Sequence, residues 1–334
     1  MTPWLENLIV IGGLAILIAT LWIWAHSDRW QRAWQRFRRD RLGIASLGII
    51  AFYLLVGLMA SLRLPAPAHG QACPTILDRL FSGVPKEKSY SAPFADTTYS
   101  VNRPEPLKGR HPLGTDVLGK DVLLQTAKAC RTALIIAGLT SLIYIPLGTL
   151  LGIVAGYFRR WVDDIIQYVY ITLASIPNIL LLVAILMVLG KGLSQMAIAL
   201  GITSWVGLCR LIRGESMRQA TRPYVEAARA LGHGPWVIIT RHILPNVMHL
   251  VIINLVLGFS GLVLSESILS YIGVGAPVGT PSWGLMIDSA RMELSREPVV
   301  WWYLVSATGA LFFLVLSLNL LGDALRRAFD PKSS

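Results

Sequence analysis

Charged residues are scarce in this sequence. They make up 15% of its 334 residues, whereas 54% of the side chains are apolar. Soluble domains carry about one quarter charged residues, and they hide most large apolar side chains in a core. A chain with so little charge cannot hide its apolar surface in that way, so a single soluble globular domain is excluded.

Sequence patterns that mark catalytic and nucleotide-binding sites are also missing. The sequence holds no Gly-x-x-x-x-Gly-Lys-Ser/Thr loop, which predicts that this chain has no nucleotide site. Its histidines at 111, 233, 242 and 249 do not cluster as metal ligands do. No Ser/His/Asp or Cys/His set stands out either. We therefore expect no enzyme activity, no metal centre and no cofactor within this chain.

Long apolar runs are what the sequence has in abundance. A helix needs roughly 20 mostly apolar residues to cross the hydrocarbon core of a bilayer. Seven runs meet this length, at about 4–25, 42–62, 132–157, 165–189, 193–212, 247–272 and 301–321. They predict an all-α fold, a polytopic bundle of about seven transmembrane helices with one long external loop.

The distribution of positive charge predicts the orientation of these helices. In a soluble protein, the formal net charge of +11 would suggest a nucleic-acid partner. If the spans alternate, however, 17 of the lysines and arginines share one side of the membrane, in the segments 26–41, 159–160, 210–241 and 326–332. The short loops of the other side hold only Lys191, Arg291 and Arg296. Positive loops stay in the cytoplasm, so we expect a periplasmic N-terminus, a cytoplasmic C-terminus and no nucleic acid.

The first apolar run could be a secretory signal peptide or an uncleaved membrane anchor. Glu6 stands where a signal peptide has its basic region, and the run is longer than the apolar region of such a peptide. Trp22, Trp24 and His26 stand where a cleavage site would need small residues. These features favour an uncleaved anchor whose two tryptophans lie at the membrane interface.

The segment 63–131 is the one sizeable soluble piece. Eight of its residues are prolines and it shows no sustained helical or strand period, which predicts mostly irregular structure outside the membrane. Cys73 and Cys130 border the outer face and could pair in an oxidising periplasm, but their separation does not follow from the sequence. Cys209 is most simply a small apolar core residue.

We divide the chain into four parts from these patterns. Residues 1–41 hold the additional N-terminal helix and a basic linker, and residues 42–131 hold the next span with the external loop. The core spans occupy 132–322, with a cytoplasmic elbow at 221–245. Residues 323–334 form a cytoplasmic tail.

Small residues and prolines mark special positions in the spans. Gly148, Gly152 and Gly156 recur every four residues and share one helix face, which permits close approach of a second helix. Pro146 and Pro177 fall inside the third and fourth spans. Ordinary membrane-helix variety and a kink that serves a moving gate are both open at each proline.

The elbow at 221–245 has recognisable start and stop residues. Thr221 can cap a helix that has Pro223 in its first turn, and Gly232 can end that helix in a left-handed turn. Pro235 then opens a second helical piece. Pro245 marks a break before the span at 247–272.

One face of the first helix carries small and apolar side chains. Tyr224, Ala227 or Ala228, and Leu231 fall on one side, at spacings of three, four and seven. The small alanines would let that face sink into a groove on another protein. A helix–Gly–helix elbow on the membrane surface can transmit rigid-body motion from a soluble partner to a membrane helix. An ordinary amphipathic loop helix is the alternative.

A motif in this helix resembles the EAA loop of ABC-importer permeases. It runs Glu226-Ala227-Ala228-Arg229-Ala230-Leu231-Gly232, and after ten residues Ile243-Leu244-Pro245 follows. In that family a short coupling helix docks into a groove of the ATPase subunit. The resemblance implies a docking element formed by Tyr224, Glu226, Ala227, Ala228, Leu231, Gly232 and Pro245.

Further motifs resemble the second-type permease of dipeptide, oligopeptide and nickel importers. Residues 110–121, RHPLGTDVLGKD, are similar to that family's HPLGTDxxGRD motif. Residues 281–284, PSWG, are similar to its PSWG stretch, and 322–331, GDALRRAFDP, to its closing GDxLRDxLDP. The resemblance covers roughly 42–334, so the run at 4–25 is an addition whose role the sequence leaves open.

The first of these motifs implies an outer mouth for a translocation path. By the resemblance, its residues are His111, Pro112, Gly114, Asp116 and Asp121, and the two aspartates can cap a short interfacial helix. Lys120 replaces the family's arginine, which keeps the charge but loses the planar fork.

Glu266 is the one acid well inside a predicted span, and a carboxylate there is costly enough to suspect a function. It can line the path, as can Trp283, or bind a substrate amine. We favour a packing carboxylate bonded to nearby serines, because the family has an acid at this place across differing substrates. The alternative function is a proton-coupled secondary transporter with Glu266 as its titrating group. A membrane-bound enzyme is a weaker third.

The resemblance implies a permease subunit of an ATP-binding-cassette importer in the bacterial inner membrane. It implies a homologous second permease, two cytoplasmic ATPase subunits that hold ATP and Mg, and a periplasmic or lipoprotein substrate-binding protein. Peptides are the expected cargo. Nickel, opines, sugars and antibiotic-like peptides stay open, since selectivity rests with the binding protein.

Overall fold

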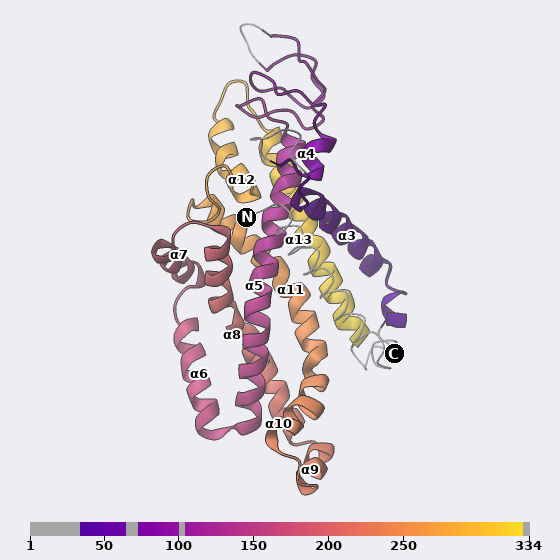
Figure 1. Cartoon of the computed structure of the whole chain (residues 1–334), viewed down its shortest axis with the longest axis vertical. Coiled ribbons are helices and arrows are strands. Elements are labelled where there is room, and N and C mark those ends of the chain that lie inside the picture. The colour runs from indigo at the N-terminus through magenta and orange to yellow at the C-terminus, as the bar shows by residue number, and fades with distance from the viewer. Residues whose placement is uncertain (1–33, 65–72, 100–103, 330–334) are drawn as a thin grey trace. The chain divides into compact units, whose positions relative to one another are not determined.

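The computed structural model describes residues 34–64, 73–99 and 104–329 (Figure 1). Within these ranges the regular structure is helical, and β pairing is limited to the isolated bridges Arg63–Thr75, Thr97–Pro106 and Thr115–Asp121. The predicted all-α fold is confirmed. The run at 4–25 lies outside the described residues.

Five stretches of helix in the described residues are long and apolar enough to cross a bilayer. They are α3 (Arg41–Ser61), α5 (Val122–Phe158), α8 (Leu193–Ala220), α13 (Trp302–Phe329) and the run Pro235–Tyr271. That run consists of α10 (Pro235–Ile238), the π-helix η1 (Ile239–Ile243) and α11 (Leu244–Tyr271). Each of these corresponds to a span predicted from the sequence.

The predicted span at 165–189 is broken in two. It comprises α6 (Arg160–Ala174) and α7 (Asn178–Leu189), which meet at 88°. Pro177 lacks the N–H that would continue the helix and disfavours helical backbone at Ile176, so α6 ends just before it. At 12 residues α7 is about 18 Å long, too short to cross the hydrocarbon core alone. Of the two readings that the sequence left open at each proline, a kink is present at Pro177, whereas α5 continues through Pro146.

The helix after the external loop starts earlier than the apolar run suggested. α5 begins at Val122, ten residues before the predicted boundary at 132. The apolar run does not extend into these first turns because Lys128 is charged. Its ammonium forms an ion pair with Asp78 of the loop helix α4 (Ile76–Leu80). Partial burial opposes ionisation of Asp78, but the Lys128 ammonium and hydrogen bonds at Thr75 outweigh it and lower the pKa of that carboxyl.

The chain divides into two compact units. Of the described residues, the first holds 34–64, 73–99, 104–135 and 263–328, and the second holds 136–262 and Phe329. The long helices α5 and α11 each contribute to both.

In the second unit α5 packs closely on α8 through the predicted glycine face (Figure 1). A Cβ added at Gly148 would lie 3.0 Å from the Trp205 carbonyl oxygen, and one at Gly152 would lie 2.8 Å from that of Cys209. At Gly156 it would lie 2.6 Å from Cβ of Ser216. All three distances are shorter than a normal carbon contact, so the predicted close approach of a second helix is confirmed.

An ion pair joins α6 to α8 inside the same unit. Arg213 donates through Nε and Nη2 to the two carboxylate oxygens of Asp163, at 2.5 and 2.7 Å, and the amide of Gln167 also donates to Asp163. Asp163 is buried, so its partners replace the water that it loses. Asp163 was not singled out in the sequence, because nothing in its spacing indicates a partner 50 residues away.

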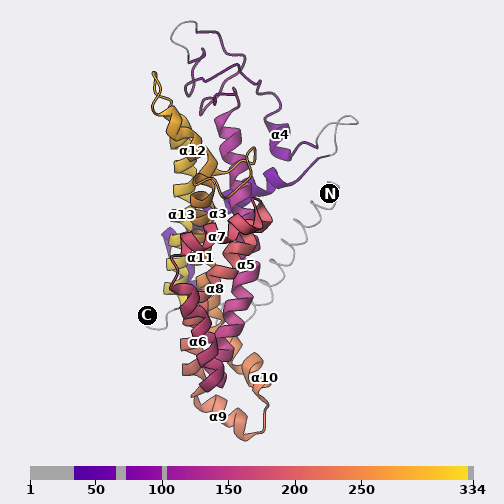
Figure 2. The same cartoon turned by 90° about the vertical axis from the view of Figure 1, so that its left-hand side faces the viewer.

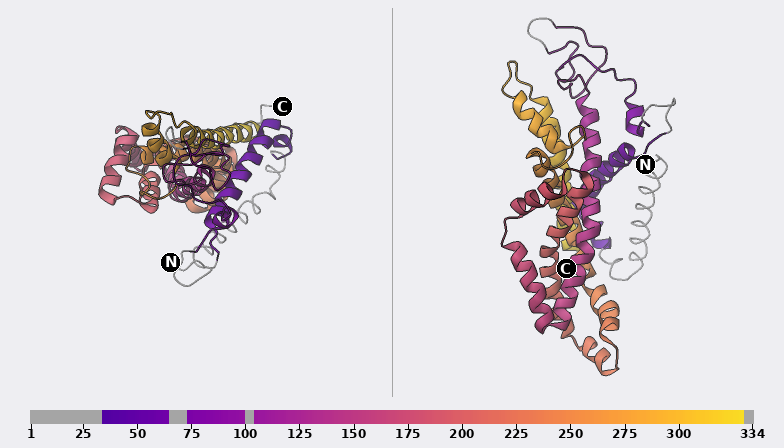
Figure 3. Two further views of the ribbon diagram at one scale, coloured as in Figure 1. Left: turned by 90° about the horizontal axis from the view of Figure 1, so that it is seen from above. Right: turned by 60° about the vertical axis from the view of Figure 1, so that its left-hand side comes forward.

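The first unit holds α3 against α5 and α13 (Figure 3). The Tyr53 hydroxyl donates to the Ala310 carbonyl oxygen at 2.8 Å, and the Cys130 thiol lies 3.3 Å from the Tyr53 carbonyl oxygen. Cys130 is buried in this contact and Cys73 is half-buried, and both are free thiols. The pairing that the sequence left open is therefore not formed in this structure.

The glycine face gives a stability prediction. Gly152→Ala should lower the thermal stability of the detergent-purified protein by about 1–3 kcal/mol, because the new methyl group meets α8. Gly138→Ala is the matched control in the same helix, since no atom lies within 4 Å of a Cβ there. The control should keep or gain up to about 1 kcal/mol from its better helix propensity. Equal unfolding temperatures for the two variants would contradict the close packing.

Candidate functional site

The predicted elbow contains the short helix α9 (Pro223–Ala230), which follows α8 (Figure 2). Pro223 occupies its first position, where its missing N–H costs nothing. The cap residue is Arg222, which makes no side-chain capping bond. The Thr221 hydroxyl instead donates to the Arg218 carbonyl oxygen at 3.0 Å, so the predicted threonine cap is wrong.

Gly232 ends α9 as the sequence predicted. Its φ of 80° is in the left-handed region. Its N–H donates to the Arg229 carbonyl oxygen, and the N–H of His233 donates to that of Ala228. This pair of bonds is a Schellman motif, which turns the chain sharply after the eight residues of α9, a little over two turns.

α9 buries a narrow face against this chain and leaves the rest accessible. Val225 and Ala228 are 0% and 4% exposed. Tyr224, Glu226 and Ala227 are exposed, as are Leu231 and Gly232 beyond the helix end. Ala228 is therefore not available on the docking face to which the sequence analysis assigned it, and it anchors the helix instead.

Tyr224 ties α9 to the two helices on either side of it. Its hydroxyl donates to the side chain of Gln219 on α8 at 2.5 Å and accepts from the side-chain amide of Asn246 on α11 at 3.1 Å. The Arg229 guanidinium lies over the ring of Tyr157 on α5, 5.1 Å from its centre. α9 is thus linked to three membrane-spanning helices by side chains, a role that spacing alone did not reveal.

Pro245 does not break the chain as predicted. The helix runs from Pro235 to Tyr271, and the π-helix Ile239–Ile243 stands directly before the proline. The wider turn gives the N–H of Leu244 a bond to the Ile239 carbonyl oxygen, five residues back. A single continuous rod therefore leads from the elbow into α11. Trp236, which the sequence analysis overlooked, is 60% exposed at the start of this rod.

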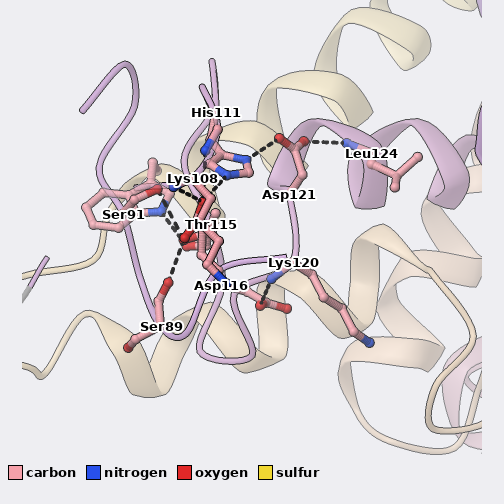
Figure 4. A network of polar contacts seen from close by, with 12 residues as sticks. Ser89, Ser91, Lys108, His111, Thr115, Asp116, Lys120, Asp121 and Leu124 are labelled. Carbon is pink, nitrogen blue, oxygen red and sulfur yellow. Dashed lines mark hydrogen bonds and ion pairs between the residues drawn. The ribbon is translucent and has the colours of Figure 1, made fainter. Parts of the chain in front are cut away.

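The outer motif builds a buried polar network (Figure 4). His111 is 1% exposed, and its Nδ1 lies 2.8 Å from Oδ2 of Asp121. Its Nε2 lies 3.5 Å from Oε1 of Glu87. The other oxygen of Asp121 accepts from the N–H of Leu124 in the first turn of α5. Asp121 therefore caps a 37-residue helix and not the short interfacial helix that was predicted.

Asp116 organises the turn before α5 in the same network (Figure 4). One carboxylate oxygen accepts from the N–H groups of Leu118 and Lys120, at 2.9 and 2.8 Å. The other accepts from the amide of Gln125. Gly114 has a φ of 74°, and a Cβ there would strike the Ser91 carbonyl oxygen, which explains why glycine fits this turn.

The other residues of the outer motif divide between the two environments: Thr115 and Gly119 are buried, whereas Arg110, Val117, Leu118 and Lys120 are exposed. Pro112 is half-buried beside His111. Thr115 donates from its hydroxyl to the Ser89 carbonyl oxygen at 2.8 Å, and its own carbonyl oxygen accepts from the indole of Trp302. The motif is thus a scaffold that fixes the start of α5, and its charged side chains mostly serve that scaffold.

A cavity of about 870 Å³ lies in the first unit beside this scaffold. Its wall includes four cationic side chains and four acidic ones, namely Lys86, Lys120, Lys128, Arg131, Asp116, Asp121, Asp288 and Glu293. Tyr90 and Tyr303 also line it. Burial and the nearby Glu293 carboxylate raise the pKa of Tyr90, so its hydroxyl stays protonated at physiological pH. The cavity can therefore meet positive and negative groups of a ligand together.

Glu266 lies inside the first unit, with no exposed surface. One carboxylate oxygen accepts from the hydroxyls of Ser270 and Ser282, at 2.9 and 2.8 Å, and the other lies 3.3 Å from that of Ser267. Ser282 caps α12 (Trp283–Glu293). Glu266 is not among the residues that line the cavity. Its contacts are those of the packing carboxylate that the sequence analysis favoured.

Trp283 and the loop before it are held in the same core. The Trp283 indole donates to the Thr126 carbonyl oxygen at 3.0 Å, and the side chain is 1% exposed. Gly273 has a φ of 86° and closes α11 with a second Schellman motif. Among the described residues, no group of three or more His, Cys, Asp or Glu side chains is placed to hold a metal ion.

Comparison with known proteins gives matches along most of the chain. Residues 148–334 match the family described as binding-protein-dependent transport system inner membrane component. Residues 28–72 match the N-terminal transmembrane domain of oligopeptide transport permease C. The first match contains α9 and Glu266, and the second contains α3.

Curated relatives align over nearly the full length. A glutathione transport system permease protein of Pectobacterium atrosepticum is 29% identical over 303 residues, which cover 91% of both chains. A dipeptide transport system permease protein of Lactococcus lactis is 28% identical, again over 91% of both. An oligopeptide transport system permease protein of Haemophilus influenzae is 30% identical over 91% of this chain and 88% of its own.

These relatives are transport permeases, and none of them supports the proton-coupled alternative. The family match covers more than half of this chain and includes the whole elbow. The chain therefore belongs to the binding-protein-dependent transport system inner membrane components, as a multi-pass permease subunit of an ATP-binding-cassette importer.

Proposed function

We propose that this chain forms half of an import path for peptides or related small solutes, together with a homologous second permease. Two cytoplasmic ATPase subunits that hold ATP and Mg supply the energy, and a periplasmic or lipoprotein binding protein delivers the cargo. The observation that carries this proposal is α9, which exposes Glu226 and Ala227 while its buried face ties it to membrane helices.

α9 has the mechanical properties that a coupling helix needs. Its Tyr224 bridges α8 and α11, and Arg229 reaches α5. A displacement of α9 by a partner that contacts its exposed face would therefore be transmitted to three helices at once. Closure of the ATPases on ATP would shift the permease between inward-open and outward-open states, since binding energy that favours one state changes the populations.

The orientation follows from the charge distribution. α9 and the arginine-rich segments lie in the cytoplasm, with the C-terminus, and the N-terminus is periplasmic. The outer motif and the cavity beside it then face the periplasm, where a binding protein releases cargo. Pro245 lies at the start of α11, in the continuous helix that would transmit motion from the elbow into the membrane.

Short peptides suit the cavity wall better than a purely cationic or anionic solute. A peptide has an ammonium group at one end and a carboxylate at the other, and the wall supplies both acidic and basic side chains. The names of the relatives include dipeptide, oligopeptide and glutathione transport, all of them peptide cargo. We therefore propose peptides as the cargo class.

The Schellman turn after α9 gives a test of the docking role. Gly232→Ala should reduce the amount of ATPase that co-purifies with the permease roughly tenfold, because a left-handed alanine costs about 1–2 kcal/mol and displaces the end of the helix. Gly234→Ala is the matched control, since its φ of −67° is ordinary and no atom lies within 4 Å of a Cβ. Both variants should reach the membrane in equal amounts.

The control should retain the wild-type amount of ATPase. If Gly232→Ala and the same change at Gly234 bind equal amounts, the docking role of α9 is wrong. A stronger variant, Glu226→Lys, reverses the charge on the exposed face without touching Val225 or Ala228 and should also reduce association.

Glu266 gives a second test, which separates ATP-driven from proton-coupled transport. Glu266→Gln keeps an acceptor oxygen for Ser270 and Ser282, so ATP-dependent uptake into proteoliposomes of the complete importer should persist. Glu266→Ala removes that acceptor and should destabilise the protein by about 1–3 kcal/mol. Uptake that a proton gradient drives without ATP, and that the glutamine variant abolishes, would overturn the proposed function.

A further inference from the structure

An arginine cluster lies where the start of α3 meets the end of α13 (Figure 3). We define it by six exposed side chains, Arg36, Arg38, Arg39, Arg41, Arg326 and Arg327. Three aspartates stand within three residues of them in the sequence, Asp40, Asp323 and Asp330. The first four arginines and the last two are almost 290 residues apart in the chain, so only the fold brings them together.

The scaffold of the cluster is tightly built. Oδ1 of Asp40 accepts from the N–H groups of Leu42 and Gly43 and so caps α3, and its Oδ2 accepts from Nη2 of Arg327 at 2.6 Å. A Cβ added at Gly43 would lie 2.8 Å from Cβ of Ala324 and 3.0 Å from the buried ring of Phe37. Two helix ends and the segment before α3 are therefore held in one place.

Asp40 neutralises only one arginine of the cluster. The hydrogen bond from Arg327 lowers the pKa of this carboxyl, so it stays ionised and its charge is already matched. Within the described part of the chain, Arg39, Arg41 and Arg326 form no ion pair. The guanidinium groups of the cluster repel one another, and a bound anion would reduce that repulsion.

The surroundings of the cluster identify the anion. The charged group stands at the ends of α3 and α13, which are long and apolar enough to cross a bilayer, and the ends of such helices lie at the level of the lipid headgroups. Next to it α3 presents apolar side chains outward, with Leu42 61%, Phe52 61% and Leu55 55% exposed. Trp34, with the Arg38 guanidinium 5.3 Å above its ring, is the kind of residue that settles at a membrane interface.

We propose that the arginine cluster is a binding site for an anionic phospholipid. The phosphate of the headgroup lies among Arg39, Arg41 and Arg326, and the acyl chains lie along the exposed face of α3. Clusters of four to eight basic residues next to a transmembrane helix attract anionic lipid in this way. The site depends on neither the cargo nor the ATPase subunits, so it stands or falls separately from the proposed function.

The test measures lipid binding to the purified full chain in detergent. Native mass spectrometry counts bound lipid during titration with dioleoylphosphatidylglycerol, and with dioleoylphosphatidylcholine, which has the same acyl chains but no net charge. The anionic lipid should bind and the zwitterionic one should not. In the triple variant Arg39→Gln, Arg41→Gln, Arg326→Gln, affinity should fall roughly fivefold per arginine, on the order of a hundredfold in all.

A matched variant removes the same charge from elsewhere on the proposed cytoplasmic side. Arg160→Gln, Arg210→Gln, Arg218→Gln changes three other exposed arginines and should bind the lipid as the wild type does. Asp40→Asn should raise affinity several-fold, because it frees the charge of Arg327 without removing an arginine. That measurement keeps the proposal testable even if the triple variant is unstable.

Three results would overturn the proposal. The first is equal lipid affinity in the triple variant and its matched control. The second is binding that inorganic phosphate, at the same ionic strength, abolishes completely, because the site would then serve a soluble anion. The third is crosslinking of Arg39→Cys to the second permease in every assembled complex, since a protein would then cover the cluster.

Discussion

Polar groups inside a bilayer must find partners within the protein, because the hydrocarbon core offers none. This constraint explains where the polar side chains of this permease stand. Asp163 accepts two hydrogen bonds from the guanidinium of Arg213 on α8, and Glu266 is hydrogen-bonded to three serines. At the start of α5, Asp121 and Asp116 accept from N–H groups in the first turn of the helix and in the turn before it. Residues that look functional because they are polar thus first serve to hold helices in register.

The same constraint shapes how motion can pass through the molecule. Glycines bring α5 and α8 into backbone contact, and side chains of α9 reach α5, α8 and α11. The π-helix lets one rod continue past Pro245 into α11. An importer driven by separate ATPase subunits needs such stiffness, because a movement of the ATPases changes the transport path only if the membrane helices move with them. In the proposed function the permease contributes these linked helices, and the partner ATPases contribute the energy.

For the outer motif, the resemblance and the structure explain different things. Resemblance marked residues 110–121 as an outer mouth, and the structure shows that half of them are buried in a scaffold. The neighbouring cavity takes its charges from Lys86, Asp288 and Glu293 as well as from the motif. Side chains that meet a ligand can therefore lie outside the motif that fixes their position.

Sequence alone determined the properties that depend on local pattern. Run length predicted five of the long helices, and glycine spacing predicted the α5 contact face and the turn at Gly232, because helical period and backbone sterics act within a few residues. Only the tertiary structure decided what depends on distant partners. Ala228 faces inward, Pro245 continues a helix, and Arg213 pairs with Asp163. Each follows from packing between segments, which no local pattern records.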